Sequence, residues 1–475
     1  MPPDPDEELR ELSSRPIWSA IGIGLACVAL VLGVLIPIAV TREPSEAAVW
    51  VDIITRSLTV FAGVGGGFAL WLAFRRQQAT ELASRREHRQ RQREADDARR
   101  DATERRITEL RIEAVAQLGS DKAAVRIGGL HNLERLGEEY PRLRQIILNE
   151  LCAYLRMPFV MPAEDGSDNA YARVEREVRL TAQRIIERHV RLDDPHRWEH
   201  GGVNFAGAVL ERVDFRGADL GHANFSRATF YGDLLMRQAH FTSAKFNGAV
   251  FHGAVHLRGA KVLGGAWFNN ATVHGAFLAR GAVFQGTTRF RETYFTASVS
   301  FRGATFGSSA MFSHVTFEGD VNLNSVRFLG PLDLYRTRFL SIVQCDRMDA
   351  RSDARFGRTE FRGATRLQGA TFRMVARFEN SVFPSDTRFH NVRFYGHAVF
   401  AGTTFLDQAE FDGSYFHHSA DFSTTHFAHA DAFAGHRRCD DIYAALAYAH
   451  HWPAGWRVVD NSNRVGYGRL ERTPA

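Results

Sequence analysis

The sequence predicts an all-β solenoid with four short faces per turn, preceded by a two-helix transmembrane hairpin and an α-helical linker. Two observations predict the solenoid: large apolar residues recur every five or six positions across 203–436, and a small or β-branched residue stands two positions before nearly every one of them. Two apolar stretches near the amino terminus predict the hairpin.

Composition sets broad limits on the class of protein. A chain of 475 residues is long enough for two or three domains, and its formal charge of +5 is too small to support an argument by itself. The four cysteines are far apart and form no C-x-x-C pair, which suits a reducing compartment and predicts neither a disulfide framework nor a zinc site. They are Cys27, Cys152, Cys345 and Cys439.

The amino-terminal region predicts a membrane hairpin over 17–74, after an acidic tail over 1–16. Residues 17–40 contain no charge, and these 24 residues exceed the roughly 20 that span a hydrocarbon core. A signal peptide would have a shorter apolar region and a basic preceding segment. The second span is expected over 51–74, where Gly63 and Gly67 form a G-x-x-x-G that indicates either helix contact or simple tolerance of glycine.

The flanking charges predict the orientation of the hairpin. The loop between the spans has one arginine and two glutamates, whereas residues 75–93 have seven arginines and two glutamates. The positive-inside rule therefore places both termini and the bulk of the chain in the cytoplasm, on a cell membrane crossed twice. Of these arginines, the sequence singles out Arg75, Arg76, Arg85 and Arg86 as candidates for contact with anionic headgroups; a solvated helix is the alternative.

Helices are expected between the membrane spans and the repeats. Residues 75–111 are rich in Arg, Glu, Gln and Ala with almost no apolar stripe, which predicts a charged helix. Residues 112–200 become amphipathic and predict a small helical neck domain, including a helix over 171–190. Nothing in this neck has a catalytic pattern.

After residue 200 the apolar spacing becomes five, and then alternates between five and six. Neither spacing suits an isolated helix or strand. One series recurs every eleven residues from Phe246 to Phe433, and a second runs from Phe251 to Phe427. Of 32 phenylalanines after residue 200, only Phe277 is off this register.

The spacing has a physical explanation in stacked short strands. Each short extended segment offers one small and one large inward position, and a tight turn follows in which glycine is often found. One such face cannot bury its ring, but identical faces stacked about 4.8 Å apart place ring on ring. Each buried Phe or Leu then contributes on the order of 1.5–3 kcal/mol before entropy is subtracted.

The repeats resemble the pentapeptide-repeat family, whose pattern A-(D/N)-L/F-x-x is visible in GADLGHANFSRATF at 217–230. The resemblance implies a right-handed quadrilateral β-helix. This chain departs from it in having 22 residues per coil, and we expect the extra residues as bulges at every second corner. Residues 114–143 and 451–471 also resemble segments of bacterial membrane-anchored members. The carboxyl-terminal extension, 437–475, is expected to form a hairpin that turns at 461–463 and covers the open end of the solenoid.

Two further expectations test the coil. Arg355 and Arg377 should share one face, while Arg366 and Arg388 share the opposite face, because a coil of eleven residues would leave too thin a core. Cys345 occupies a large inward position and should be a buried, unreactive thiol. Its coil, with Ala350 at the next such position, should be thinly packed; a helical excursion of this stretch is the alternative.

The sequence carries no pattern for catalysis or for a cofactor. It has no G-x-S-x-G, H-E-x-x-H or P-loop, so we expect no enzymatic activity, no cofactor, no metal and no catalytic residue. The adjacent pairs His417–His418 and His450–His451 are poorly placed to chelate one ion, because neighbours on a strand point to opposite faces.

Two functions remain. The first is a membrane-anchored cytoplasmic scaffold whose β-helix faces bind a protein partner that the sequence does not identify; self-association is also compatible with it. The second is a role with nucleic acid, because some members of the family imitate duplex DNA. Such mimicry requires an acidic surface, and residues 203–436 contain 24 basic and 19 acidic residues. Nucleic-acid partnership is therefore disfavoured, and direct binding would need a concentrated basic stripe.

Overall fold

The computed structural model describes residues 44–162, 170–428, 442–460 and 464–473, together with 22–24, 26, 28–30, 33–34 and 37. The described chain divides into two compact units, 1–105 and 106–475, and each is treated by itself below. Phe433, Cys27 and Cys439 lie outside the described residues.

The first unit is mostly one long helix. Helix α3 (Pro44–Leu118) runs without interruption through the expected second span and through the charged segment 75–111. Among the described residues, the structure contains no helix with the length and apolarity needed to cross a membrane. Most of 17–40 lies outside the described residues, so the hairpin stays a prediction.

The second unit begins with a neck of packed helices. It contains α4 (Ala123–Glu139), the 3₁₀ turn η2 (Pro141–Leu143), α5 (Arg144–Arg156) and α6 (Ala170–His189), together with the end of α3. Their amphipathic faces meet in a core that includes Leu130, Leu133, Ile147, Leu151 and Ile186, each completely buried. The 3.6-residue periodicity of these segments therefore reports a real apolar face.

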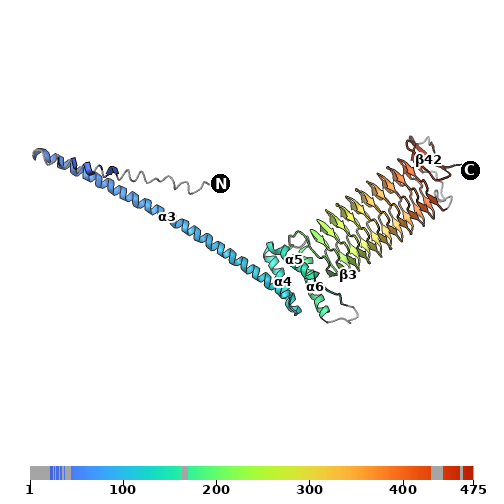
Figure 1. The fold of residues 1–475 in the computed structure, drawn as a ribbon, viewed down its shortest axis with the longest axis horizontal. Coiled ribbons are helices and arrows are strands. Elements are labelled where there is room, and N and C mark those ends of the chain that lie inside the picture. The colour runs from blue at the N-terminus through green and yellow to red at the C-terminus, as the bar shows by residue number, and fades with distance from the viewer. Residues whose placement is uncertain are drawn as a thin grey trace. The chain divides into compact units, whose positions relative to one another are not determined.

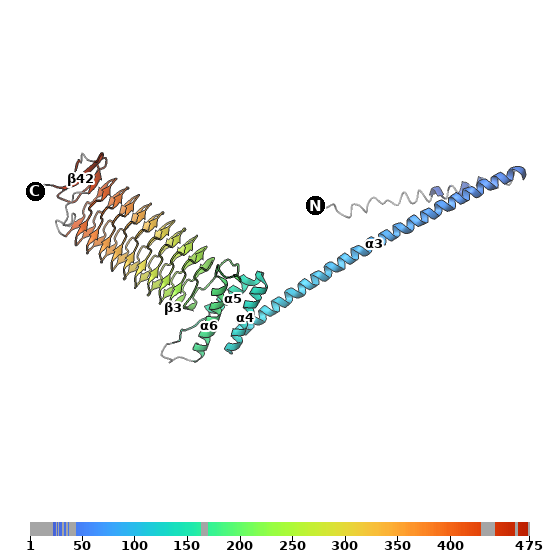
Figure 2. The same ribbon diagram turned by 180° about the vertical axis from the view of Figure 1, so that it is seen from behind.

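After the neck, short strands stack into four parallel sheets, which Figures 1 and 2 show as the long ribbed body. Each sheet is named here by its first strand, and within each coil the chain visits the β2, β1, β4 and β5 sheets in turn. Consecutive strands of one sheet are mostly 22 residues apart, as in Val283 beside Thr305. The predicted four-faced solenoid with a coil of 22 residues is confirmed.

The β1 sheet contains β1 (Val209–Glu211), β3 (Thr229–Tyr231), β7 (Val250–Phe251), β11 (Thr272–Val273), β15 (Tyr294–Phe295), β19 (Thr316–Phe317), β23 (Arg338–Phe339), β27 (Glu360–Phe361), β31 (Val382–Phe383), β35 (Thr404–Phe405) and β39 (His426–Phe427). The β2 sheet contains β2 (His222–Asn224), β6 (Ser243–Lys245), β10 (Ala266–Trp267), β14 (Thr288–Arg289), β18 (Ala310–Met311), β22 (Leu332–Asp333), β26 (Ala354–Arg355), β30 (Ala376–Arg377), β34 (Ala398–Val399) and β38 (Ala420–Asp421).

The β4 sheet contains β4 (Leu234–Leu235), β8 (Val255–His256), β12 (Phe277–Leu278), β16 (Val299–Ser300), β20 (Val321–Asn322), β24 (Val343–Gln344), β28 (Thr365–Arg366), β32 (Thr387–Arg388) and β36 (Ala409–Glu410). The β5 sheet contains β5 (His240–Phe241), β9 (Lys261–Val262), β13 (Val283–Phe284), β17 (Thr305–Phe306), β21 (Arg327–Phe328), β25 (Asp349–Ala350), β29 (Thr371–Phe372), β33 (Arg393–Phe394), β37 (Tyr415–Phe416), β40 (Tyr443–Ala445), β42 (Tyr467–Arg472) and β41 (Trp456–Asp460).

The coil has two kinds of corner, which explains the alternation of five and six. Corners from the β2 to the β1 sheet and from the β4 to the β5 sheet are tight turns, whose second residue has a positive φ, as at Asn270 (56°) and Gly281 (64°). The other two corners, such as those through Gly275 and Gly286, take one more residue without a positive φ. The extra residue therefore lies at every second corner, as expected.

The interior consists of stacked rings. Phe356, Phe378, Phe400 and Phe422 form one such column, with neighbouring ring centroids 4.5–4.8 Å apart and nearly parallel planes. Rings from adjacent sheets meet these columns edge to face, an arrangement that aromatic quadrupoles favour. The interior is thus filled by side chains, as in a packed core.

Phe277, the one ring off register, is completely buried all the same. It takes the small inward position of β12, beside Val255 and Val299 in the neighbouring strands. Ala279 takes the large position of the same face, between Leu257 and Phe301. The two positions have exchanged sizes, so the coil keeps its total side-chain volume.

Cys345 lies within a regular coil. Strands β24, β25 and β26 carry the chain through this stretch, so a helical excursion is excluded. Cys345 is 3% exposed and Ala350 is 1% exposed, as the register predicts. A small apolar cavity of about 10 Å³ lies one coil earlier, lined in part by Leu323 and Leu334, where leucine replaces phenylalanine.

We expect Cys345 to be unreactive in the folded protein. Burial raises the pKa of its thiol, and burial also raises the pKa of the Cys152 thiol to about 12, so neither forms the reactive thiolate. A chain carrying Cys27→Ser and Cys439→Ser should react with a thiol reagent only after denaturant is added. Rapid labelling before denaturation would contradict this packing.

Both ends of the solenoid are covered. At the first coil, the chain after α6 supplies backbone partners: Asp219 N–H donates to the Val190 carbonyl (2.8 Å) and Leu192 N–H donates to the Gly217 carbonyl (3.0 Å). At the last coil, β40 pairs with β37 and β42 pairs antiparallel with both β40 and β41, while Trp452 stacks on Phe422. Residues 461–463, between β41 and β42, lie outside the described residues. These covers satisfy the exposed edges that parallel stacks leave open.

Candidate functional site

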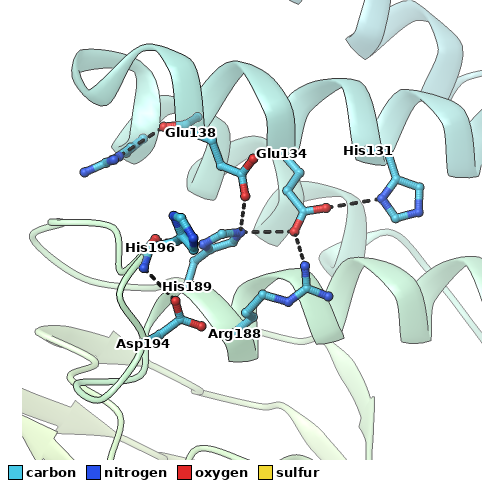
Figure 3. A network of polar contacts seen from close by, with 9 residues as sticks. His131, Glu134, Glu138, Arg188, His189, Asp194 and His196 are labelled. Carbon is cyan, nitrogen blue, oxygen red and sulfur yellow. Dashed lines mark hydrogen bonds and ion pairs between the residues drawn. The ribbon is translucent and has the colours of Figure 1, made fainter.

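The neck contains a dense group of ionisable side chains between α4 and α6. Figure 3 shows His189 reaching from the end of α6 toward Glu134 and Glu138 on α4. Helix α4 places these two carboxylates on one face because they are four residues apart. His189 is completely buried and Glu134 is 7% exposed, so the group lies inside the neck.

Hydrogen bonds define the charge state of this group. His189 Nδ1 lies 3.0 Å from the His196 carbonyl oxygen, and His189 Nε2 lies 3.0 Å from Glu134 Oε1. Both neighbours are acceptors, so only the doubly protonated imidazolium satisfies both contacts. Its hydrogen bond to Glu134 is the largest cause that holds the pKa of that carboxyl below its ordinary value.

Further contacts fix the two helices around this ion pair. Arg188 Nη1 donates to the same oxygen of Glu134 at 2.9 Å, and His131 Nδ1 lies 3.2 Å from the other oxygen. The His189 ring stacks on Trp198, with centroids 4.3 Å apart. Trp198 in turn lies so close to Gly137 that a Cβ there would come within 2.5 Å of the indole.

The same residues offer the ligand types of a metal site. One ligand atom each from Glu134, Glu138 and His189 lies within 4.8 Å of the others. A metal would need the lone pair of His189 Nε2, which the proton donated to Glu134 occupies, and Arg188 already places a second positive charge on that carboxylate. The geometry therefore assigns the group to an ion-pair network that joins α4 to α6.

A second set of contacts joins α6 to the first coil. Arg176 Nε and Nη2 donate to the two oxygens of Glu211 at 2.6 and 2.5 Å, and Gln183 Nε2 donates to the Glu211 carbonyl at 2.8 Å. Glu187 Oε1 accepts from Gln183 Nε2 and from Asp214 N–H, both at 2.9 Å. Burial raises the pKa of Glu187 from 4.5 to about 7. Sequence patterns did not reveal this joint, because its partners are 28 or more residues apart.

The histidine pairs separate as strand geometry requires. His417 lies against Tyr467 and stacks on Tyr395, whereas His418 stacks on Tyr448. In the second pair, His450 Nδ1 accepts from Ala420 N–H, and His451 Nδ1 lies 3.9 Å from a carboxylate oxygen of Asp421. Neither pair brings its two rings to a common point.

The arginines chosen from the sequence are divided between opposite faces. Arg355 is the direct neighbour of Arg377 in the β2 sheet, and Arg366 is the direct neighbour of Arg388 in the β4 sheet. Arg377 bonds Glu379 (3.2 Å) and Arg388 bonds Asp386 (2.8 Å), so much of this charge is neutralised locally. The expected division of positive charge is confirmed.

The four candidate headgroup arginines lie on α3. Arg76, Arg85 and Arg86 are exposed, and the Arg75 guanidinium lies 5.2 Å from the centre of the Trp71 ring. Trp71 and an arginine so placed form a cation–π pair at the boundary between the apolar and charged parts of the helix. Their contact with headgroups stays a prediction.

Charge is unequally distributed along the solenoid, a feature that the total count conceals. Residues 215–307 contain ten basic and three acidic residues, whereas residues 308–428 contain thirteen of each. The half of the solenoid that follows the neck is therefore strongly basic, and the other half is neutral. Counting by coil instead of by domain would have revealed this from the sequence.

Comparison with known proteins agrees with the repeat geometry. The family model described as "Pentapeptide repeats (9 copies)" matches residues 200–240, 246–293, 279–327, 356–404 and 378–426. No curated protein and no solved structure matches the chain. The matched segments fall on the stacked coils between the two end covers, and the chain is a pentapeptide-repeat protein.

Proposed function

We propose that the protein is a membrane-anchored, non-catalytic scaffold whose pentapeptide-repeat solenoid presents binding faces in the cytoplasm. The observation that carries the non-catalytic part is the filled interior: stacked rings occupy the coil, and the polar side chains that the structure describes on the faces are paired or solvated. A rigid body with regular flat faces suits binding of a partner better than turnover of a substrate.

Exposed apolar residues on α3 support the membrane anchor. Val60, Leu70 and Phe74 are 66%, 74% and 61% exposed, and the protein offers them no cover within the described part of the first unit. Apolar side chains left bare along a helix need an apolar environment. The uncharged stretch over 17–40 supports a first span of the same hairpin.

The topology is testable by labelling intact cells. In a chain lacking Cys27 and Cys439, a cysteine in place of Ser45 should react with an impermeant thiol reagent, because the loop between the spans would face outward. A cysteine in place of Ser423, at an exposed turn of the solenoid, should react only after the cells are opened. The opposite pattern would overturn the orientation, and extraction of the chain by alkaline buffer without detergent would overturn the anchor.

A further inference from the structure

One edge of the solenoid carries a single column of arginines. The column contains Arg216, Arg237, Arg258, Arg280 and Arg302, and we call it the arginine edge. Each is the first residue of the tight turn that leads from the β4 to the β5 sheet, in five successive coils. All five are exposed.

Backbone hydrogen bonds between successive turns hold these residues in line. The carbonyls of Arg237, Arg258, Arg280 and Arg302 each accept from an N–H of the preceding turn, at 2.9–3.0 Å; the donors are Gly217, Gln238, Gly259 and Gly281. Neighbouring coils lie about 4.8 Å apart, so the column is a straight row of guanidinium groups.

The positive charge of the row is largely free. Arg216 bonds Asp214 (2.6 Å) and Arg237 Nη2 lies 3.5 Å from His256 Nδ1, but Arg258, Arg280 and Arg302 have no hydrogen bond or ion pair with any described residue. The outward residues of the flanking strands from β4 to β17 include no acid: Leu235, His256, Leu278 and Ser300 on one side, and His240, Lys261, Val283 and Thr305 on the other. The row ends where Asn324 and then Asp346 take the same turn position.

The turn also makes the row accessible. Four of the five arginines are followed by a glycine with positive φ, for example Gly259 (67°) and Gly303 (66°). No side chain therefore stands beside the guanidinium group on that side, and the row projects from a ridge. A flat surface can reach every member of a straight ridge at once.

We propose that the arginine edge docks on an anionic lipid surface. This rests on the proposed membrane anchor. Arginine binds phosphate and carboxylate groups through paired N–H donors, and basic side chains near an anionic bilayer gain free energy additively. Tethering by the hairpin would raise the effective concentration of the membrane, so a row of five weak contacts suffices. The flanks carry no tyrosine, phenylalanine or tryptophan on which bases could stack, which disfavours single-stranded nucleic acid.

Energy transfer from the solenoid to the bilayer tests this proposal. The full chain, with Cys27→Ser, Cys439→Ser and a donor dye on Thr305→Cys, is reconstituted in vesicles that contain acceptor-labelled lipid. We expect transfer to rise when phosphatidylcholine vesicles are replaced by equal parts phosphatidylcholine and phosphatidylserine, and to fall again in high salt. The triple variant Arg258→Gln, Arg280→Gln, Arg302→Gln should lose this rise.

A matched variant controls for total charge. Arg336→Gln, Arg358→Gln and Arg366→Gln remove three exposed arginines from the neutral half and should leave the rise intact. A rise that survives in the first triple variant, or no rise in the parent chain, would overturn the proposal. If poly-glutamate binds the parent chain and not the first triple variant while phosphatidylserine has no effect, the edge binds acidic protein instead.

Flotation separates this result from the anchor. All variants should float with phosphatidylcholine vesicles if the hairpin is inserted, whatever the edge does. A chain that does not float with these vesicles contradicts the anchor. In that case, flotation with phosphatidylserine vesicles that is lost in the first triple variant would still support the edge.

Discussion

Replacing Phe378 by alanine is expected to destabilise the solenoid by about 3–5 kcal/mol. The ring is completely buried, and it stacks on Phe356 and Phe400 with centroids 4.5 and 4.8 Å away. Phe372 and Phe389 meet it edge to face. Neighbouring rings held by their own coils cannot collapse into the space, so most of the void would remain.

Leucine provides the matched control. Leu334 occupies the same column between Phe312 and Phe356, which shows that a leucine fits there, and Phe378→Leu should cost only about 1 kcal/mol. Each coil contacts only its neighbours, so the damage should stay local. Hydrogen exchange should accelerate in the coils around Phe378 and remain slow in α4 and α5. Equal acceleration in both regions, or equal costs for the two variants, would contradict the column as the source of stability.

The four-faced architecture could be predicted because its cause repeats. Each coil must present the same inward positions, so the eleven-residue period records the geometry many times, and Arg355 beside Arg377 follows from it. Phe277 shows the limit of that reasoning. A ring off register suggested an exception, whereas the paired signal, Phe277 with Ala279 two residues later, indicates an exchange of sizes within one face.

The neck could be predicted as helical, but its joints could not. His189 and Glu134 are 55 residues apart, and nothing in either local pattern connects them. The contact arises because α4 and α6 pack side by side and bury both groups, which then satisfy one another. The same holds for Glu187 and the backbone of Asp214, whose contact exists only because the neck covers the first coil.

The arginine edge was present in the sequence but required a different register. Arg355, Arg366, Arg377 and Arg388 recur at eleven and are therefore divided between opposite faces. Arg237, Arg258, Arg280 and Arg302 recur at 21 or 22, which is one coil, and are therefore stacked. Only when the coil length is established does a spacing of this size indicate neighbours.

Glu187 makes the stability of the joint between neck and solenoid depend on pH. Burial raises its pKa from 4.5 to about 7, so the folded state holds a proton that the unfolded state releases at lower pH. Stability attributable to this group is present below pH 4.5 and is lost as the pH rises toward 7, by about 3 kcal/mol for a shift of this size. Glu134, Glu211 and Asp214, whose pKa values are lowered, act in the opposite direction and at more acidic pH.

Glu187→Gln isolates this effect, because glutamine keeps Oε1 for the hydrogen bonds from Gln183 and Asp214 N–H but cannot ionise. The variant and the parent chain should be about equally stable at pH 4.5, whereas at pH 8 the variant should be more stable by about 3 kcal/mol. Urea unfolding of the full chain in detergent, followed by circular dichroism at both pH values, measures the difference between the two proteins, from which the other carboxyls cancel. A constant difference across this range would mean that water reaches the Glu187 carboxylate and that the neck covers the first coil less tightly than these contacts require.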